Sequence, residues 1–240
     1  MMSSVVALLL VVTACLAQAP PAFETTSVKP NRSMHNGIDN RFSPGYTRWT
    51  NVSLDTLIED LYRIKDYQLE GGPGWIKSDR WDIEGKTASP ATNQEMFVMM
   101  RALLADRFQL HFHIETKERP VYHLTVAKGG PKLVTAHPQD ENHRWGTDAG
   151  RGSLMMMGTT MKRFAGWLSS QLNQPILEET GLAGNYDLKI EWKDDADTSD
   201  DPTRPSIFTA VKDRLGLELR AGKGPVEVFV IDHVERAAAN

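Results

Sequence analysis

Two short segments of this chain repeat one another, and they constrain the fold more than any other feature. ADRFQL at 105–110 and KDRLGL at 212–217 share an Asp-Arg pair in an apolar context, and Arg214 follows Arg107 at a shift of 214 − 107 = 107. Solenoid repeats have periods of about 20–50 residues, whereas this spacing is that of a small domain. The repeat therefore predicts two related units in one chain.

Hydrophobic periodicity gives each half the same order of elements. In the first half we predict strands at 46–51 and 81–86, helices at 54–61 and 96–104, and a hairpin of 110–115 with 121–126. Ser53 is the predicted N-cap of the helix at 54–61, and Thr160 follows it at 160 − 53 = 107 as the corresponding helix start. Other landmarks follow at nearly constant shifts: Tyr186 after Trp81 (186 − 81 = 105) and Pro225 after Pro120 (225 − 120 = 105). The pattern predicts an internal duplication.

The predicted fold class is α+β, with two tandem related β-α-β-α-β-β units. Each unit has two helices packed on a small mixed or antiparallel sheet. We place the first unit at 20–135, a polar linker at 136–150 and the second unit at 151–240. The acidic stretch KDDADTSDDPTRP at 193–205 is predicted to be a solvated loop inside the second unit.

The N-terminus has the pattern of an export signal. Residues 5–12, VVALLLVV, are too short to span a bilayer but suit a signal peptide, which we predict at 1–19. Two processing routes remain open: VTAC at 12–15 resembles a lipobox that would lipidate Cys15, and CLA at 15–17 fits ordinary cleavage. Both predict an extracytoplasmic protein without a transmembrane segment, whether periplasmic, a lipid-anchored outer-membrane protein or secreted.

Charge and cysteine content exclude several functional classes. The net charge of −4 argues against nucleic acid as a partner, because phosphate binding needs a clustered basic surface. Cys15 is the only cysteine, so the chain has no disulfide framework and no thiolate metal site.

Five segments of the sequence resemble a known family: FETTSVKPN, GGPGWIKSDRWDIEGK, LLADRFQLHFHIETKERPVYHLTVAKGGPKL, TGLAGNYDLKIEW and KGPVEVFVIDHVE. Together they look like the soil-associated protein family, an exported domain of unknown function expanded in soil bacteria. Some of its relatives are fused to membrane metallopeptidases of the β-lactam-sensor type. The resemblance implies a sensing or docking role outside the cytoplasm.

The second half carries another resemblance. Four segments are similar to the short N-terminal domain of secretins and TonB-dependent receptors: residues 160–176, GLAGNYDLKI, SIFTAVKDRLGLELR and VEVFVIDHV. That resemblance implies a small module that docks other envelope proteins and performs no catalysis.

Three histidines are the main candidates for chemistry. If residues 117–119 form the loop of the predicted hairpin, His111, His113 and His123 project from one face and could hold zinc with an open fourth position. The alternative is that they are ordinary polar residues on the solvated side of a half-buried sheet.

Other candidates favour structural roles. The chain has no G-x-S-x-G motif, and Ser169 and Ser170 fall in the middle of a predicted helix. The pair Asp232-His233 has no recognisable nucleophile as its partner, and we interpret it as the end of a strand. Met155–Met157 fit a strand, with an adaptable binding surface as the alternative.

The sequence therefore favours a non-enzymatic envelope module without a cofactor, which docks an envelope protein or a small ligand. Strand addition to a sheet edge and docking of side chains in a groove are both open. The alternative function is a metal-binding protein or metal-dependent hydrolase that uses His111, His113 and His123.

Overall fold

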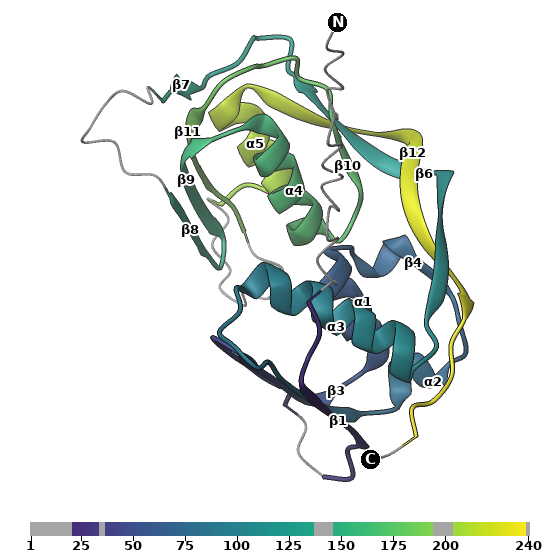
Figure 1. Cartoon of the computed structure of the whole chain (residues 1–240). Coiled ribbons are helices and arrows are strands. Elements are labelled where there is room, and N and C mark those ends of the chain that lie inside the picture. Colours follow the sequence, from purple (N-terminus) through teal and green to yellow (C-terminus); the bar gives the residue numbers. More distant parts are fainter. Residues whose placement is uncertain (1–20, 34–36, 137–145, 194–203, 239–240) are drawn as a thin grey trace, which may run out of the picture. The chain divides into compact units, whose positions relative to one another are not determined.

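The computed structural model of the protein describes residues 21–33, 37–136, 146–193 and 204–238 (Figure 1). These residues form a mixed α+β structure with five α-helices, one 3-10 helix and three four-stranded sheets. None of the described helices combines the length and the apolar character needed to cross a membrane. The predicted signal peptide at 1–19, Cys15 and the acidic residues 194–203 lie outside the described residues.

The chain passes twice through one order of elements. The first pass consists of β3 (Tyr46–Val52), α1 (Leu54–Tyr62), β4 (Leu69–Gly71), β5 (Trp81–Lys86), α3 (Asn93–Arg107) and β6 (His111–Val126). The second pass consists of β9 (Ser153–Thr159), α4 (Met161–Leu172), β10 (Ile176–Glu178), β11 (Tyr186–Glu191), α5 (Ile207–Leu215) and β12 (Leu217–His233). Each pass reads β-α-β-β-α-β, so the predicted order β-α-β-α-β-β is wrong.

The remaining elements lie before and between these. They are β1 (Thr25–Pro30), β2 (Asp39–Ser43), the 3-10 helix η1 (Asp66–Gln68), α2 (Trp75–Ser78), β7 (Val134–Thr135) and β8 (Gly146–Gly150). The last five residues of the predicted polar linker thus form a strand, because β8 pairs with β9 from Gly146 opposite Met157 to Gly150 opposite Ser153.

The predicted hairpin is also wrong, because β6 is one continuous strand of 16 residues. It pairs antiparallel with β12 from Val126 opposite Leu217 to His111 opposite His233. The supposed loop, KER at 117–119, has no glycine or asparagine of the kind that tight hairpin turns require. With β12 alongside, the backbone of β6 has a ladder partner over its whole length. We call β6 and β12 together the long ribbon.

Two short strands extend the long ribbon. β10 pairs parallel with β6, with Ile176 opposite Tyr122, and β4 pairs parallel with β12, with Leu69 opposite Phe229. One shift relates these pairs, since 176 − 69 = 107 and 229 − 122 = 107. Along the long ribbon the positions therefore correspond at 107, and the shift of 105 predicted from Pro120 and Pro225 is wrong there. Each short strand therefore pairs with the long strand of the other pass, and the sheet order is β10-β6-β12-β4.

The chain divides into two compact units that do not follow chain order. The first unit takes the described residues of Met1–Ser53, Asp79–Gln109 and Glu235–Asn240. It contains the antiparallel sheet β1-β5-β3-β2 and α3, whose Met96, Met99 and Met100 are buried as a core-helix pattern predicts. The second unit takes Leu54–Ser78 and the described residues of Leu110–Val234.

The second unit has a core between α4, α5 and two sheets (Figure 1). Thr160 caps α4 by accepting a hydrogen bond from the backbone N–H of Arg163, so the predicted helix start is confirmed. Phe164 and Leu168 recur at the helical period and are fully buried. Leu124 of β6 lies in the same core, so the far end of the first-pass strand packs among second-pass elements.

Candidate functional site

The structure does not bring the three candidate metal ligands together. His111, His113 and His123 all lie on β6, and His113 and His123 are ten positions apart on that one strand (123 − 113 = 10). At about 3.3 Å per residue the separation is about 33 Å. The predicted cluster depended on the hairpin, so it fails with the hairpin. Across the described residues, no three His, Cys, Asp or Glu side chains are grouped so that they could hold a metal ion.

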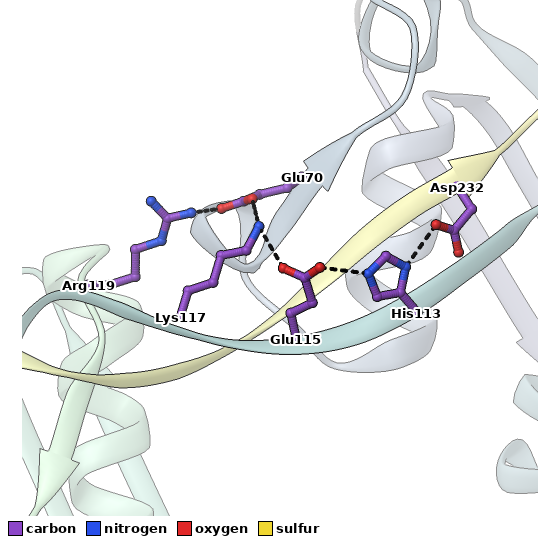
Figure 2. A network of polar contacts seen from close by, with 6 residues as sticks. All are labelled: Glu70, His113, Glu115, Lys117, Arg119 and Asp232. Atoms are coloured by element: carbon purple, nitrogen blue, oxygen red, sulfur yellow. Dashed lines mark hydrogen bonds and ion pairs between the residues drawn. The ribbon is translucent and has the colours of Figure 1, made fainter.

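His113 instead lies between two carboxylates (Figure 2). Its Nδ1 is 2.8 Å from Asp232 Oδ1 and its Nε2 is 2.9 Å from Glu115 Oε1. Hydrogen bonds to Glu115 and Asp232 raise the pKa of His113 above its usual range. The hydrogen bond from His113, followed by that from Lys117, lowers the pKa of the Glu115 carboxyl. Asp232 therefore has a partner on the neighbouring strand of the ribbon.

The contacts continue along β6 as a row of alternating charge, which Figure 2 shows in full. Lys117 Nζ lies 3.0 Å from Glu115 Oε2 and 2.7 Å from Glu70 Oε2, and Arg119 also contacts Glu70. We call Glu70, His113, Glu115, Lys117, Arg119 and Asp232 the charged row. It joins β4, β6 and β12, and its members satisfy one another.

The charged row predicts a pH-dependent stability. A His pKa that is higher in the folded state than its ordinary value near 6.5 stabilises the protein below about pH 6.5, and this contribution is lost as pH rises through the raised folded pKa. We expect His113→Gln to lower the melting temperature more at pH 6 than at pH 9. Thermal unfolding of both proteins at the two pH values measures the difference. Equal shifts at both would contradict the ionic role of His113.

A pocket of about 650 Å³ lies in the second unit. One wall is α4, through Lys162, Ala165, Gly166 and Ser169. These residues are spaced i, i+3, i+4 and i+7, so they share one face of the helix. A Cβ added to Gly166 would meet nothing within 4 Å, which shows that this wall faces open space.

The rest of the pocket lining comes from η1, β10 with its flanking residues, and the middle of β12. Its apolar lining includes Ile176, Leu177 and Val226. Three carboxylates, those of Glu178, Glu179 and Glu227, lie at its exposed margin. An apolar lining with a few polar groups is the usual composition of a ligand site.

Two linked hydrogen bonds, which we call the latch, involve Tyr67 and Ser169 of the pocket lining. Tyr67 Oη and Ser169 Oγ are 2.7 Å apart, and the Ser169 hydroxyl donates to Gln174 O at 2.7 Å. Because Ser169 has one proton and gives it to Gln174, Tyr67 is the donor to Ser169. Burial raises the pKa of Tyr67, which keeps the phenol protonated. Ser169 therefore links η1 to the residues that follow α4, and it also lines the pocket.

Four residues of the pocket lining are smaller than the residues 107 positions earlier in the chain. At the shift of 107, the first-pass counterparts of Ala165, Gly166, Ser169 and Val226 are Ile58, Glu59, Tyr62 and Arg119, and each of these is larger. The contacts correspond as well. In the first pass, Lys117 Nζ contacts Glu70. The corresponding residues of the second pass are Gly224 and Leu177, and a Cβ added to Gly224 would lie 2.6 Å from Leu177 Cδ1. The first pass has an ion pair at these positions, and the second pass has a close apolar contact.

The other candidate residues of the sequence analysis lie within helices and strands. Ser170 Oγ donates to the carbonyl of Gly166 one turn earlier in α4. β12 ends at His233, so the strand-end interpretation of Asp232-His233 is confirmed. Met155–Met157 lie in β9, as predicted, with Met156 buried and Met155 40% exposed.

Sequence reasoning missed the pocket. Tyr67 and Gln68 lie in η1, and Leu177 lies in β10, and neither element was predicted. A signal was present in the alignment of the two passes at the shift of 107, because it pairs Tyr62 with Ser169 and Glu59 with Gly166 on corresponding helix faces. Side-chain volume had to be compared position by position to see it.

Comparison with known proteins gives one match. The sequence model of a family described as "protein of unknown function (DUF3738)" matches residues 55–234, which contain every residue of the pocket and of the charged row. Neither the curated proteins nor the solved structures gave a match. Since the matched segment covers 234 − 55 + 1 = 180 of 240 residues, the chain belongs to this family of proteins of unknown function.

Proposed function

We propose that the protein is a binding module that works outside the cytoplasm, and that the pocket beside α4 is its binding site. The observation that carries this proposal is the loss of side-chain volume at Ala165, Gly166, Ser169 and Val226 relative to their first-pass counterparts. The volume of about 650 Å³ lies within the range of about 300–1,000 Å³ that ligand sites occupy.

The proposal includes an internal duplication. Two passes with one element order, and short strands paired through one shift of 107, support it. After a duplication, one copy can keep a closed, self-satisfied surface while the other changes. The charged row is then the closed version, and the pocket is the version that opened to take a ligand.

Docking of side chains explains the site better than strand addition does. The N–H of Tyr122 donates to Pro175 O, and Leu124 O accepts from the N–H of Glu179. The even-numbered residues of β6 therefore point their backbone N–H and C=O groups away from β12, toward the outer edge of the strand. Pro120 is one of these and has no N–H to offer. On β12, the carbonyl of Glu227 points outward to the Gln68 side chain, which puts Pro225 at an outward position too. Prolines at such positions protect an edge against pairing.

Gly166→Leu tests the pocket. The new side chain enters open space on the pocket wall, and leucine is the better helix former by roughly 1 kcal/mol, so the fold should not lose stability. We expect binding at the pocket to be lost. Methyl resonances of Ile176, Leu177 and Val226 report binding directly when the protein is titrated with a library of small fragments.

The control is Ser170→Leu, which adds the same side chain to the same helix outside the pocket lining. It should leave fragment binding unchanged. Fragments that shift the three methyl groups equally in wild type and in Gly166→Leu would show that the response does not come from the pocket. An absence of any such fragment would contradict the proposal itself.

Location and partners are part of the proposal and rest on the sequence. Residues 1–19 and the likeness to the soil-associated family and to the secretin and TonB-receptor module support an envelope protein that meets another envelope protein or a small ligand. Cell fractionation of wild type and Cys15→Ser distinguishes the two processing routes. Release of the variant from the membrane fraction supports a lipid anchor, and identical fractionation supports ordinary cleavage.

A further inference from the structure

We propose that the pocket takes a cationic group on an aliphatic stem, namely a lysine or arginine side chain presented by a partner protein. This inference rests on the proposed function, since it names the chemistry of the ligand for the same pocket. It is derived from what the first pass places at the corresponding positions and from the charges around the pocket.

The charged row is an internal template for the ligand. In the first pass, Lys117 and Arg119 extend from β6 and bring their cationic ends to the Glu70 carboxylate. Their counterparts at the shift of 107 are Gly224 and Val226. The second pass therefore lacks two long, basic side chains on the ribbon beside the pocket. Leu177 lies against Gly224 instead, so this part of the pocket is apolar and carries no cation of its own. A ligand with methylene groups and a terminal cation matches an apolar surface of this kind.

The apolar part of the pocket suits such a stem. Leu177 takes the position that corresponds to Glu70, and it is packed against Val121 and Val226 in a small apolar cluster. Lysine and arginine bury their methylene groups on apolar surface while the charged end stays at the margin. The apolar lining can therefore contact the methylene groups of the ligand, while its cationic end stays among the polar residues at the margin.

The charges at the margin select a cation. The pocket lining contains one lysine, Lys162, and three glutamates, namely Glu178, Glu179 and Glu227. Its net charge is therefore 1 − 3 = −2. Glu179 is paired with His123 and Glu178 accepts hydrogen bonds from Thr180. Within the described ranges, the Glu227 carboxylate has no ion-pair partner.

Glu227 is therefore the carboxylate of the lining that is left to receive a cation from outside. An anionic group would meet a lining with a net negative charge. Lys162, the cation of the lining, is seven positions from Ser169 on α4, about 10 Å along the helix axis. Its backbone is therefore distant from the latch.

Three probes of similar size test the charge preference on the full chain. They are the N-acetyl, C-methylamide derivatives of lysine, norleucine and glutamate, which present a cationic, a neutral and an anionic side chain on the same backbone. We expect the lysine probe to shift the Leu177 and Val226 methyl resonances and to bind about fivefold more tightly than the norleucine probe, as an exposed ion pair allows. The glutamate probe should bind most weakly.

Glu227→Gln is the matched variant, because it removes the charge and keeps the backbone carbonyl that accepts from Gln68. It should lower the affinity for the lysine probe about fivefold and leave the affinity for the norleucine probe unchanged. Free hexylamine serves as a fourth probe. Binding of hexylamine as tight as that of the lysine probe would overturn the protein side chain as the ligand and point to a free amine.

The outcomes separate this inference from the function that it deepens. Norleucine bound as tightly as lysine, with methyl shifts that disappear in Gly166→Leu, would overturn the cationic ligand and keep the pocket. No shift of the Leu177 and Val226 methyl groups with any probe or fragment would overturn both.

Discussion

Leu124→Ala is expected to lower the free energy of unfolding by about 2–5 kcal/mol, the usual cost of emptying a fully buried leucine site. Leu124 is near the C-terminal end of β6 and has no exposed surface. It packs in the core of the second unit with residues of α4, α5 and β12. The effect depends on a continuous β6 that carries this side chain into that core.

Ile114→Ala is the control on the same strand. Ile114 is ten positions before Leu124 (124 − 114 = 10), on the same alternating face, and is 54% exposed. Its replacement should change the unfolding free energy by no more than about 0.5 kcal/mol. Urea denaturation of the three proteins gives both values. Equal losses for the two variants would contradict the placement of β6.

Gly216→Ala is expected to cost roughly 3 kcal/mol or more, from backbone strain and crowding together. Gly216 ends α5 with φ 66°, a left-handed conformation that costs an L-residue about 1–2 kcal/mol. A Cβ there would meet the carbonyl oxygen of Gly130 and would lie 2.9 Å from the backbone nitrogen of Lys132. Crowding against backbone adds about 1–3 kcal/mol, since neither segment can move like a side chain.

Gly181→Ala separates the two contributions. Gly181 has φ 67°, but nothing lies within 4 Å of an added Cβ. It should therefore pay only the conformational cost of about 1–2 kcal/mol. Chemical denaturation compares the variants with wild type. If Gly181→Ala proved as damaging as Gly216→Ala, the close approach of 130–132 to the end of α5 would be refuted.

Local signals predicted the helices well because each helix carries its own start and its own apolar face. Ser53 before α1 and Thr160 before α4 mark starts that the structure confirms. The buried residues Leu57 and Phe164 occur at the predicted helical spacing. The strands at 46–51 and 81–86 were predicted within a residue for the same reason, as β3 and β5.

The hairpin failed because pairing is not a local property. Residues 110–126 alternate in polarity whether they fold back on themselves or lie beside another strand. The partner of β6 is β12, far later in the chain, as the pairing of Leu124 with Leu219 shows. The three-residue strands β4 and β10 were missed because their positions are set by the parallel ladder and not by their own sequence.

The candidate site could not be predicted from the sequence for a related reason. A metal site was sought where histidines alternate, but His113 finds its partners in Glu115 and Asp232. The pocket, in contrast, is marked by small residues, and Gly166 and Ser169 carry no chemical signature of their own. They stand out only when they are compared with Glu59 and Tyr62, the larger residues 107 positions earlier.

The most direct test of the account is to ask whether α4 is covered by a ligand in the cell. A photo-cross-linking amino acid is placed at position 166, on the pocket wall, or at position 170, on the same helix outside the pocket lining, in the full chain expressed in its own host. The account predicts a discrete adduct at 166 that is absent at 170. Equal labelling at both positions, or none at 166, would contradict it.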